Sequence, residues 1–241
     1  MFSPLEQFAV TILCPLVFLG FDLSITNATV YFALIFLIFY ALFTFSARNS
    51  LIIPNKWIMC FEELYVFVAT LIKAQTGKNL VYFVPVIFTV FVFILFGNLV
   101  GLFPFGYAVT GHIIVTFVIA LSFNIGFFLW GFQNHGIKFL GLFVPKDAPL
   151  IFKPLIVVIE VVSYLLRTFS LSIRLFANMM AGHTLLHILA SFCFASGLMI
   201  SFIPWALVIA ISFLEIAIAL IQTYVYSILL CIYANDIHNL H

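Results

Sequence analysis

The sequence predicts an all-α polytopic membrane protein with five transmembrane helices and one interfacial amphipathic helix. Of its 241 residues, 66% are hydrophobic and only 7% are charged, whereas soluble domains carry roughly 25% charged residues. Uncharged runs close to the ~20 residues of a spanning helix recur along the chain. Because so apolar a chain needs lipid around it, we expect a single membrane domain over residues 1–241.

Charge balance and cysteine spacing argue against several other classes. Nine basic residues nearly balance eight acidic ones, so no basic surface indicates a nucleic-acid partner. Four cysteines are scattered without a C-x-x-C pair, which argues against a zinc knuckle, an iron–sulfur site or a disulfide framework. The opening MFSPLEQFAV has no positive leader region and no small-residue cleavage site, so we expect no secretory signal there.

The first half of the chain predicts three spans and a surface helix. Residues 28–45 carry no charge and predict the first span. Residues 54–76 place large apolar side chains at helical spacing with Lys and Glu elsewhere, which is typical of a helix lying on the membrane surface; a poorly spanning segment is the alternative. Residues 80–133 contain no Asp, Glu, Lys or Arg. They include a short turn, FPFGY over residues 103–107, so they predict a two-helix hairpin.

The second half predicts two long helices. A helix over residues 155–190 would be roughly 54 Å long at about 1.5 Å per residue, whereas the hydrocarbon core is about 30 Å thick. This helix must therefore tilt strongly, bend or leave the membrane. After a turn over residues 192–203, residues 205–234 predict a second long helix, and we expect both helices to be strongly tilted.

The positions of the basic residues predict the orientation. Outside the intramembrane stretches, every Lys and Arg falls between the first and second spans or between the third and fourth. The positive-inside rule places both of these segments on the cytoplasmic or matrix side. The N-terminus is then outside and the C-terminus inside, which requires five spans.

Ionisable side chains within the predicted spans are the candidates for function, because an arginine at a helix centre costs about 2.5–3.5 kcal/mol on insertion scales. Glu160, Arg167 and Arg174 are spaced by seven and nearly repeat one helical face. Ser170 and Asn178 lie four residues on either side of Arg174 and extend this polar stripe.

The next helix offers a second polar stripe, because Glu215 and Gln222 are also seven residues apart, and we expect both stripes to face a common interior. Glu160 and Arg167 can snorkel or pair near the inner surface, whereas Arg174 lies about two turns deeper, with no acid within reach on its own helix. A guanidinium keeps its proton in proteins. The residue therefore cannot carry protons, and the pattern predicts a proton gate whose partner acid lies on another chain.

Three motifs carry a resemblance to a known family. Residues 172–183 read SIRLFANMMAGH, residues 98–104 read NLVGLFP, and a Glu and a Gln follow seven residues apart near the end. These motifs resemble F-type ATP synthase subunit a, over essentially the whole chain. The opening SPLEQF and the closing CIYAND look like the mitochondrial branch. His183 stands where many bacterial members have Glu, and Glu215 where they have His, which fits that branch; Ala177 replaces a common Gly.

The resemblance implies a stator subunit of the F0 sector that is no enzyme alone. Two offset aqueous half-channels would open to opposite sides. Arg174 would separate them, holding each c-ring carboxylate ionised as it rotates past and blocking direct leakage, so that the carboxylates exchange protons with the channels. Gln222 would face the arginine across the helix pair and position it, and Asn178 is a further candidate on the arginine's own stripe. The implied outer-side relay residues are His183, Glu215, His187, Asn98 and His112. The implied inner-side residues are Glu160, Ser170 and Asp236.

The resemblance also implies partners and a location. The partners are the c-ring, the peripheral-stalk and other F0 subunits, bilayer lipids including cardiolipin, and protons as the transported ion. The location is the mitochondrial inner membrane, with the N-terminus in the intermembrane space and the C-terminus in the matrix. No cofactor and no metal is implied, although His183 and His187 are four residues apart, a spacing that can bind a metal; a packed, hydrogen-bonded histidine is a further alternative.

Three other functions compete with the proton gate. A haem-binding subunit would place His pairs on facing helices, whereas the close pair here lies on one helix. A secondary transporter would show inverted repeats, and no pseudo-symmetric halves are evident. A structural anchor would not explain a single deep arginine.

Overall fold

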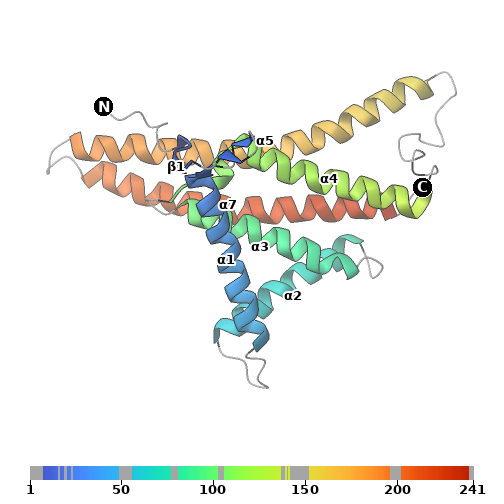
Figure 1. Ribbon diagram of the computed structural model, residues 1–241, viewed down its shortest axis with the longest axis horizontal. Helices are drawn as coiled ribbons and strands as arrows, with labels where there is room; N and C mark the ends of the chain where they lie inside the picture. Colours follow the sequence, from blue (N-terminus) through green and yellow to red (C-terminus); the bar gives the residue numbers. More distant parts are fainter. Residues whose placement is uncertain are drawn as a thin grey trace.

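The computed structural model describes residues 8–15, 17–18, 21–22, 24–48, 56–76, 81–102, 106–136, 139, 141, 152–195 and 202–238. Helices dominate these residues (Figure 1). They are α1 (Asn27–Arg48), α2 (Lys56–Thr76), α3 (Val84–Gly101), α4 (Ile113–His135), α5 (Lys153–Ala195) and α7 (Phe202–His238), with short 3-10 turns η2 (Val81–Phe83) and η3 (Val109–Gly111).

Five of the described helices are long and apolar enough to cross a membrane: α1, α3 with the preceding turn, α4, α5 and α7. The predicted all-α class with five spans is therefore confirmed. Helix α2 is not among them, since its charged residues lower its hydropathy. Its position on the membrane surface stays a prediction, and residues 54 and 55 of the predicted segment lie outside the described part.

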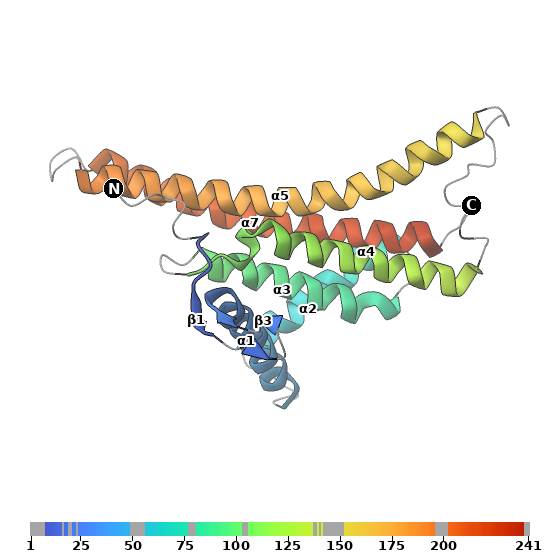
Figure 2. The same ribbon diagram turned by 45° about the horizontal axis from the view of Figure 1, so that its top comes forward.

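The two longest helices extend beyond the ranges predicted for them. Helix α5 has 43 residues and α7 has 37. Each carries a proline in its first turn, Pro154 and Pro204, where the missing N–H would have no helical partner. Helix α5 bows, and its first turns lift away from α7 and α4 (Figure 2). The bow confirms one of the three predicted outcomes, bending. The strong tilt of α5 and α7 and their extension beyond a ~30 Å core stay predictions.

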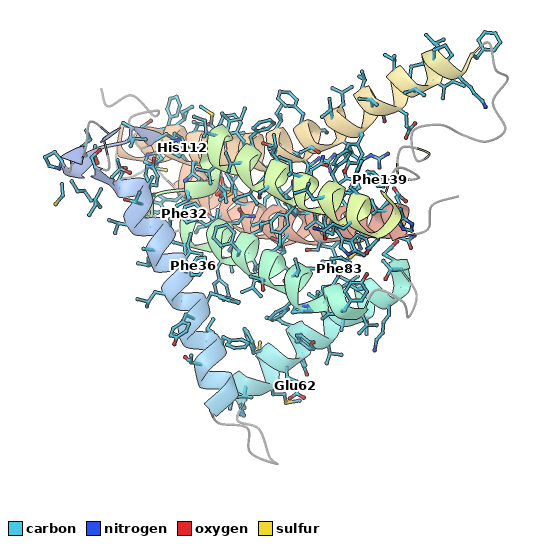
Figure 3. All side chains as sticks on the ribbon, turned by 45° about the vertical axis from the view of Figure 1, so that its right-hand side comes forward. Phe32, Phe36, Glu62, Phe83, His112 and Phe139 are labelled. Carbon is cyan, nitrogen blue, oxygen red and sulfur yellow. The ribbon has the colours of Figure 1, made fainter. Side chains whose placement is uncertain are left out.

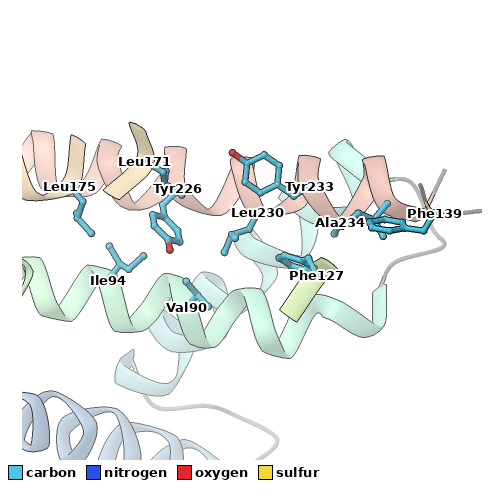
Figure 4. Packing of buried hydrophobic residues seen from close by; sticks show 11 residues of the cluster. Val90, Ile94, Phe127, Phe139, Leu171, Leu175, Tyr226, Leu230, Tyr233 and Ala234 are labelled. Carbon is cyan, nitrogen blue, oxygen red and sulfur yellow. The ribbon is translucent and has the colours of Figure 1, made fainter. Parts of the chain in front are cut away.

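The core lies where α3, α4, α5 and α7 run alongside one another. Buried side chains from these helices form one apolar cluster around Tyr226, which is fully buried (Figure 4). Small residues such as Gly131 allow close packing there, because a Cβ on Gly131 would lie 2.5 Å from Phe139. Helix α1 leaves this bundle and meets the start of α2 at its far end (Figure 3). The second half of α2 returns to the bundle, where Val68 and Ile72 pack with residues of α3 and with Cys231 of α7.

Four short strands precede α1, and the sequence analysis did not predict them. Strand β1 (Ile12–Cys14) pairs antiparallel with β4 (Ile25–Thr26), and β2 (Val17–Phe18) pairs antiparallel with β3 (Phe21–Asp22). These residues are β-branched or aromatic in large part, which suits a strand. Phe8, ahead of these strands, lies beside Gly111 of the turn η3.

Candidate functional site

A cavity of about 220 Å³ lies between α3, α5 and α7. Its wall is mainly apolar, but it includes five polar residues that the sequence analysis selected: Asn98, Asn178, His183, Glu215 and Gln222. They come from three helices that are far apart in sequence. The fold therefore brings together the NLVGLFP motif, the second half of the arginine motif and the Glu–Gln pair at one place.

Most polar side chains of this cavity are buried without a protein partner. Asn98 is fully buried, and Glu215 and His183 are each 7% exposed. Both amide atoms of Asn98, both carboxylate oxygens of Glu215 and Nε2 of His183 have no hydrogen-bond partner within the described part of the chain. An unsatisfied buried polar atom costs about 1–3 kcal/mol. A cavity of this size and polarity can hold several water molecules that satisfy such atoms.

Gln222 contacts Asn178 instead of the arginine that we expected it to position. The Nδ2 amide of Asn178 donates a hydrogen bond of 3.3 Å to Oε1 of Gln222, which joins α5 to α7. Asn178 lies one helical turn beyond Arg174. Through Asn178, Gln222 fixes the turn of α5 that follows the arginine, and the Nε2 of Gln222 still faces the cavity region unpaired.

Arg174 lies on the exposed flank of α5 and not in the shared interior that the sequence analysis predicted. Ser172, two positions earlier, is fully buried and hydrogen-bonds Thr116 of α4 at 3.2 Å. Two positions correspond to about 200° around a helix, so the guanidinium points away from α4. Glu160 and Ser170 of the same stripe are also exposed. The prediction of one common interior is wrong for these three residues.

No acid of the described chain neutralises Arg174. Within the described ranges, no carboxylate oxygen lies within 4.0 Å of its guanidinium. Arg167, the other arginine of the stripe, differs, because its Nη1 lies 3.6 Å from Oδ2 of Asp236 and its guanidinium sits 5.3 Å from the ring centroid of Tyr233. Arg167 is therefore held by α7, while Arg174 presents a permanent charge to whatever covers this flank.

The two remaining predicted histidines lie outside the cavity wall. His187 is exposed one turn beyond His183 on α5. His112 precedes α4 and stacks on Tyr107, whose hydroxyl is hydrogen-bonded to Nε2 of His112. Burial lowers the pKa of His112 and raises that of Tyr107, so at neutral pH the phenol keeps its proton and the imidazole is neutral. Among the residues described, no group of three or more His, Cys, Asp or Glu could hold a metal ion.

Two features of the site escaped the sequence analysis. Thr168 and Ser172 of α5 hydrogen-bond Asn124 and Thr116 of α4; their spacing of four residues was the available signal. Gly182 adjoins the cavity acid, since a Cβ on Gly182 would lie 2.6 Å from an oxygen of Glu215.

Comparison with known proteins places the chain in one family. Residues 28–235 match the family of the ATP synthase A chain. The chain is 49% identical to ATP synthase subunit a of Acanthamoeba castellanii, over 99% of this chain and 98% of the relative. It is 43% identical to subunit a of Dictyostelium discoideum, over 99% of each. It is 40% identical to subunit a of the bacterium Pelagibacter ubique, over 99% of this chain and 98% of the relative.

Proposed function

Because the chain belongs to the ATP synthase subunit a family, we propose that Arg174 separates two aqueous half-channels and holds passing c-ring carboxylates ionised, so that these carboxylates exchange protons only with the two channels. As a family member the chain is a multi-pass, proton-translocating F0 subunit that is not catalytic alone. The proposal concerns how its side chains move the proton and which of them do so.

The observation that carries the proposal is the unneutralised charge of Arg174. The residue lies in the middle of a membrane-spanning helix, is exposed, and has no acid of the described chain beside it. A charge in hydrocarbon is costly unless a partner or water meets it. A carboxylate arriving on a ring subunit meets this need, and the fixed cation keeps that carboxylate ionised until it has passed.

The cavity supports the outer half-channel. Glu215 and His183 can each bind and release a proton, and Asn98, Asn178 and Gln222 can hold water between them. Since Glu215 and His183 line one cavity, a proton can pass between them through water without crossing the apolar cluster around Tyr226. His112 and His187, which lie outside the cavity wall, stay predictions for this path.

The inner half-channel is proposed on the opposite end of α5. Glu160 and Ser170 are exposed on the same flank as Arg174. Asp236 of α7 is ion-paired with Arg167, which lies between Glu160 and Ser170 on α5. A proton leaving a ring carboxylate beyond Arg174 would meet Ser170 first and Glu160 two to three turns later. These residues lie toward the side that the positive-inside rule assigns to the matrix.

The cellular setting follows from the motifs of the sequence. The reciprocal placement of His183 and Glu215 and the terminal motifs favour the mitochondrial inner membrane, with the N-terminus in the intermembrane space and the C-terminus in the matrix. The partners are then the c-ring, the peripheral stalk and other F0 subunits, with cardiolipin among the surrounding lipids. The long helices α5 and α7 offer the extended flank that a ring requires.

Cross-linking tests whether the Arg174 flank faces the ring. In a chain whose exposed Cys14 and Cys60 are replaced by serine, cysteines at Ala177 and Ala181 would carry a benzophenone label. Both alanines are exposed on the same flank as Arg174, so illumination of the assembled complex should join them to a c subunit.

The matched control for this experiment is Ser122→Cys, which is exposed on α4. It should give no product with a c subunit. Equal yields at Ser122 and Ala177, or no ring product from either alanine, would mean that another surface meets the ring.

Gly182→Ala is expected to slow proton-driven ATP synthesis without preventing assembly. The added methyl group would lie 2.6 Å from the Glu215 carboxylate, which must turn aside within the cavity. Displacing a reacting group by about 1 Å costs up to ~100-fold, and we expect a loss of about 10-fold or more. Gly126→Ala is the control, because a Cβ there meets nothing within 4 Å; the same loss in both variants would contradict the reason given.

A further inference from the structure

Phe8 packs directly on one of the two titratable residues of the cavity. Its ring lies edge-on to the imidazole of His183, with ring centroids 6.1 Å apart and planes at 89°. His183 is a wall residue of the cavity and is 7% exposed. The contact joins residues far apart in sequence, the N-terminal segment and the last third of α5.

A second contact holds the same ring from the other side. A Cβ built on Gly111 would lie 3.0 Å from Cε1 of Phe8, so the backbone of η3 touches the phenylalanine edge. Gly111 is itself buried. The ring therefore lies between η3 and α5, at the end of the bundle where the N-terminal strands and His112 lie (Figures 1 and 3).

Hydrogen bonds fix the segment that carries Phe8. The Nδ2 amide of Asn27 donates to the carbonyl of Ala9 at 3.1 Å, and the backbone N–H of Thr11 donates to Oδ1 of Asn27 at 3.3 Å. The N–H of Asn27 in turn donates to the carbonyl of Thr11 at 3.1 Å. Asn27 is the first residue of α1. Phe8 is therefore tied to a membrane-spanning helix through Ala9, the residue that follows Phe8 in the chain.

We infer that Phe8 is a positioning residue that covers part of the His183 imidazole at the cavity wall and fixes its orientation. The inference rests on the proposed function in one respect, that the cavity is the outer half-channel. A phenyl ring neither donates nor accepts a proton and excludes water from the imidazole edge that it covers. The proton then reaches His183 only from the cavity, beside Glu215.

Chemical labelling of His183 tests the cover. Diethyl pyrocarbonate carbethoxylates accessible imidazole, and peptide mass spectrometry of the whole ATP synthase in nanodiscs gives the rate at each histidine. The carbethoxylation rate of His183, divided by that of exposed His187 on the same helix, should rise about five- to tenfold in Phe8→Ala. A rise of this size matches the loss of one edge-to-face aromatic contact. Phe8→Leu, which keeps an apolar cover, should restore most of the protection.

Two further variants keep the test decisive. Gly111→Ala pushes the intact phenyl ring from its other side and should raise the His183 rate in the same direction, even where Phe8→Ala fails to assemble. Phe36→Ala removes the same side chain from a position on α1 that is 62% exposed and should leave the rate unchanged. An unchanged labelling rate of His183 in Phe8→Ala would overturn the inference. Where Phe8→Ala does not assemble, an unchanged rate in Gly111→Ala would do so. An equal rise in Phe36→Ala would also overturn it.

The functional readout separates this inference from the proposed function. If Phe8 positions His183, Phe8→Ala should change how ATP synthesis depends on the pH of the outer compartment, and Phe8→Leu should restore the wild-type profile. A wild-type profile in Phe8→Ala would overturn the positioning role. Labelling of His183 reports the cover whether or not Glu215 carries protons, so a failure of the half-channel assignment would appear in Glu215 variants and not in the labelling.

Discussion

Arg174→Ala is expected to abolish proton-driven ATP synthesis in a complex that still assembles. Opposite charges about 4 Å apart attract by about 4 kcal/mol at an effective dielectric constant of 20, which corresponds to roughly a 10³-fold preference for the ionised carboxylate. Without that preference, a ring carboxylate can pass the arginine position while protonated, and flow uncouples from rotation. ATP synthesis and passive proton leak in proteoliposomes measure both consequences, and the leak should rise.

Arg167→Ala is the matched control for this variant. It removes an arginine side chain from the same helix, seven residues before Arg174. The guanidinium of Arg167 is paired with Asp236 of the same chain. That pair is partly exposed, with side chains 38% and 46% accessible, so its loss should cost little stability and leave most of the synthesis rate. Normal synthesis in Arg174→Ala, or an equal loss in both variants, would remove Arg174 from the gating role.

Glu215→Gln is expected to slow proton uptake from the outer side by about 100-fold, the low end of the range for a positioned acid–base group. Glutamine keeps the size and hydrogen-bonding capacity of the side chain but cannot bind and release a proton. The cavity and its contact with Gly182 should therefore survive. The rate of ATP synthesis under an imposed pH gradient gives the measurement.

The cross-link from the cysteine at Ala177 to a c subunit should persist in Glu215→Gln, because ring contact does not depend on the carboxylate. Glu62→Gln is the matched control, since Glu62 is exposed and lies on α2 (Figure 3), a helix that contributes no residue to the cavity wall. Synthesis at the wild-type rate in Glu215→Gln would reject the relay assignment and leave the role of Arg174 standing.

The helical fold was predictable because lipid imposes one solution on long apolar segments. A charge-free run such as residues 28–45 must satisfy its backbone groups internally, which makes it a helix. The ends of α5 and α7 were less predictable, since Pro154 and Pro204 fit inside the first turn as well as before it. Strands β1 and β4 were missed because they are short and pair only through residues 11 or more positions apart. Strands β2 and β3 pair locally but have only two residues each, too few for an alternating pattern.

The face that Arg174 presents could not be derived from its spacing. A seven-residue repeat shows that Glu160, Arg167 and Arg174 share a side of the helix, but not whether that side turns inward. The buried positions Leu171, Ser172 and Leu175 decide this, and in an apolar helix nothing distinguishes them from residues that face lipid. A stripe of buried small hydroxyl residues at Thr168 and Ser172 was the available clue.

The composition of the cavity was largely predictable, and its cover was not. Asn98, His183 and Glu215 stood out as polar residues in apolar surroundings. Phe8 is one of 32 phenylalanines, and the SPLEQF motif that it ends carries a family resemblance but does not predict a contact with His183. Its contact with His183 exists because Asn27 holds the N-terminal segment over α5, a long-range arrangement that periodicity does not encode.

The most direct test is a density map of the assembled complex that resolves side chains where α5 meets the rotor. The Arg174 guanidinium should lie opposite a ring carboxylate, in contact at about 4 Å or through one water, with Glu160 and Glu215 on opposite sides of it along the membrane normal. A guanidinium paired with a carboxylate of its own chain, on a flank covered by lipid, would contradict the account.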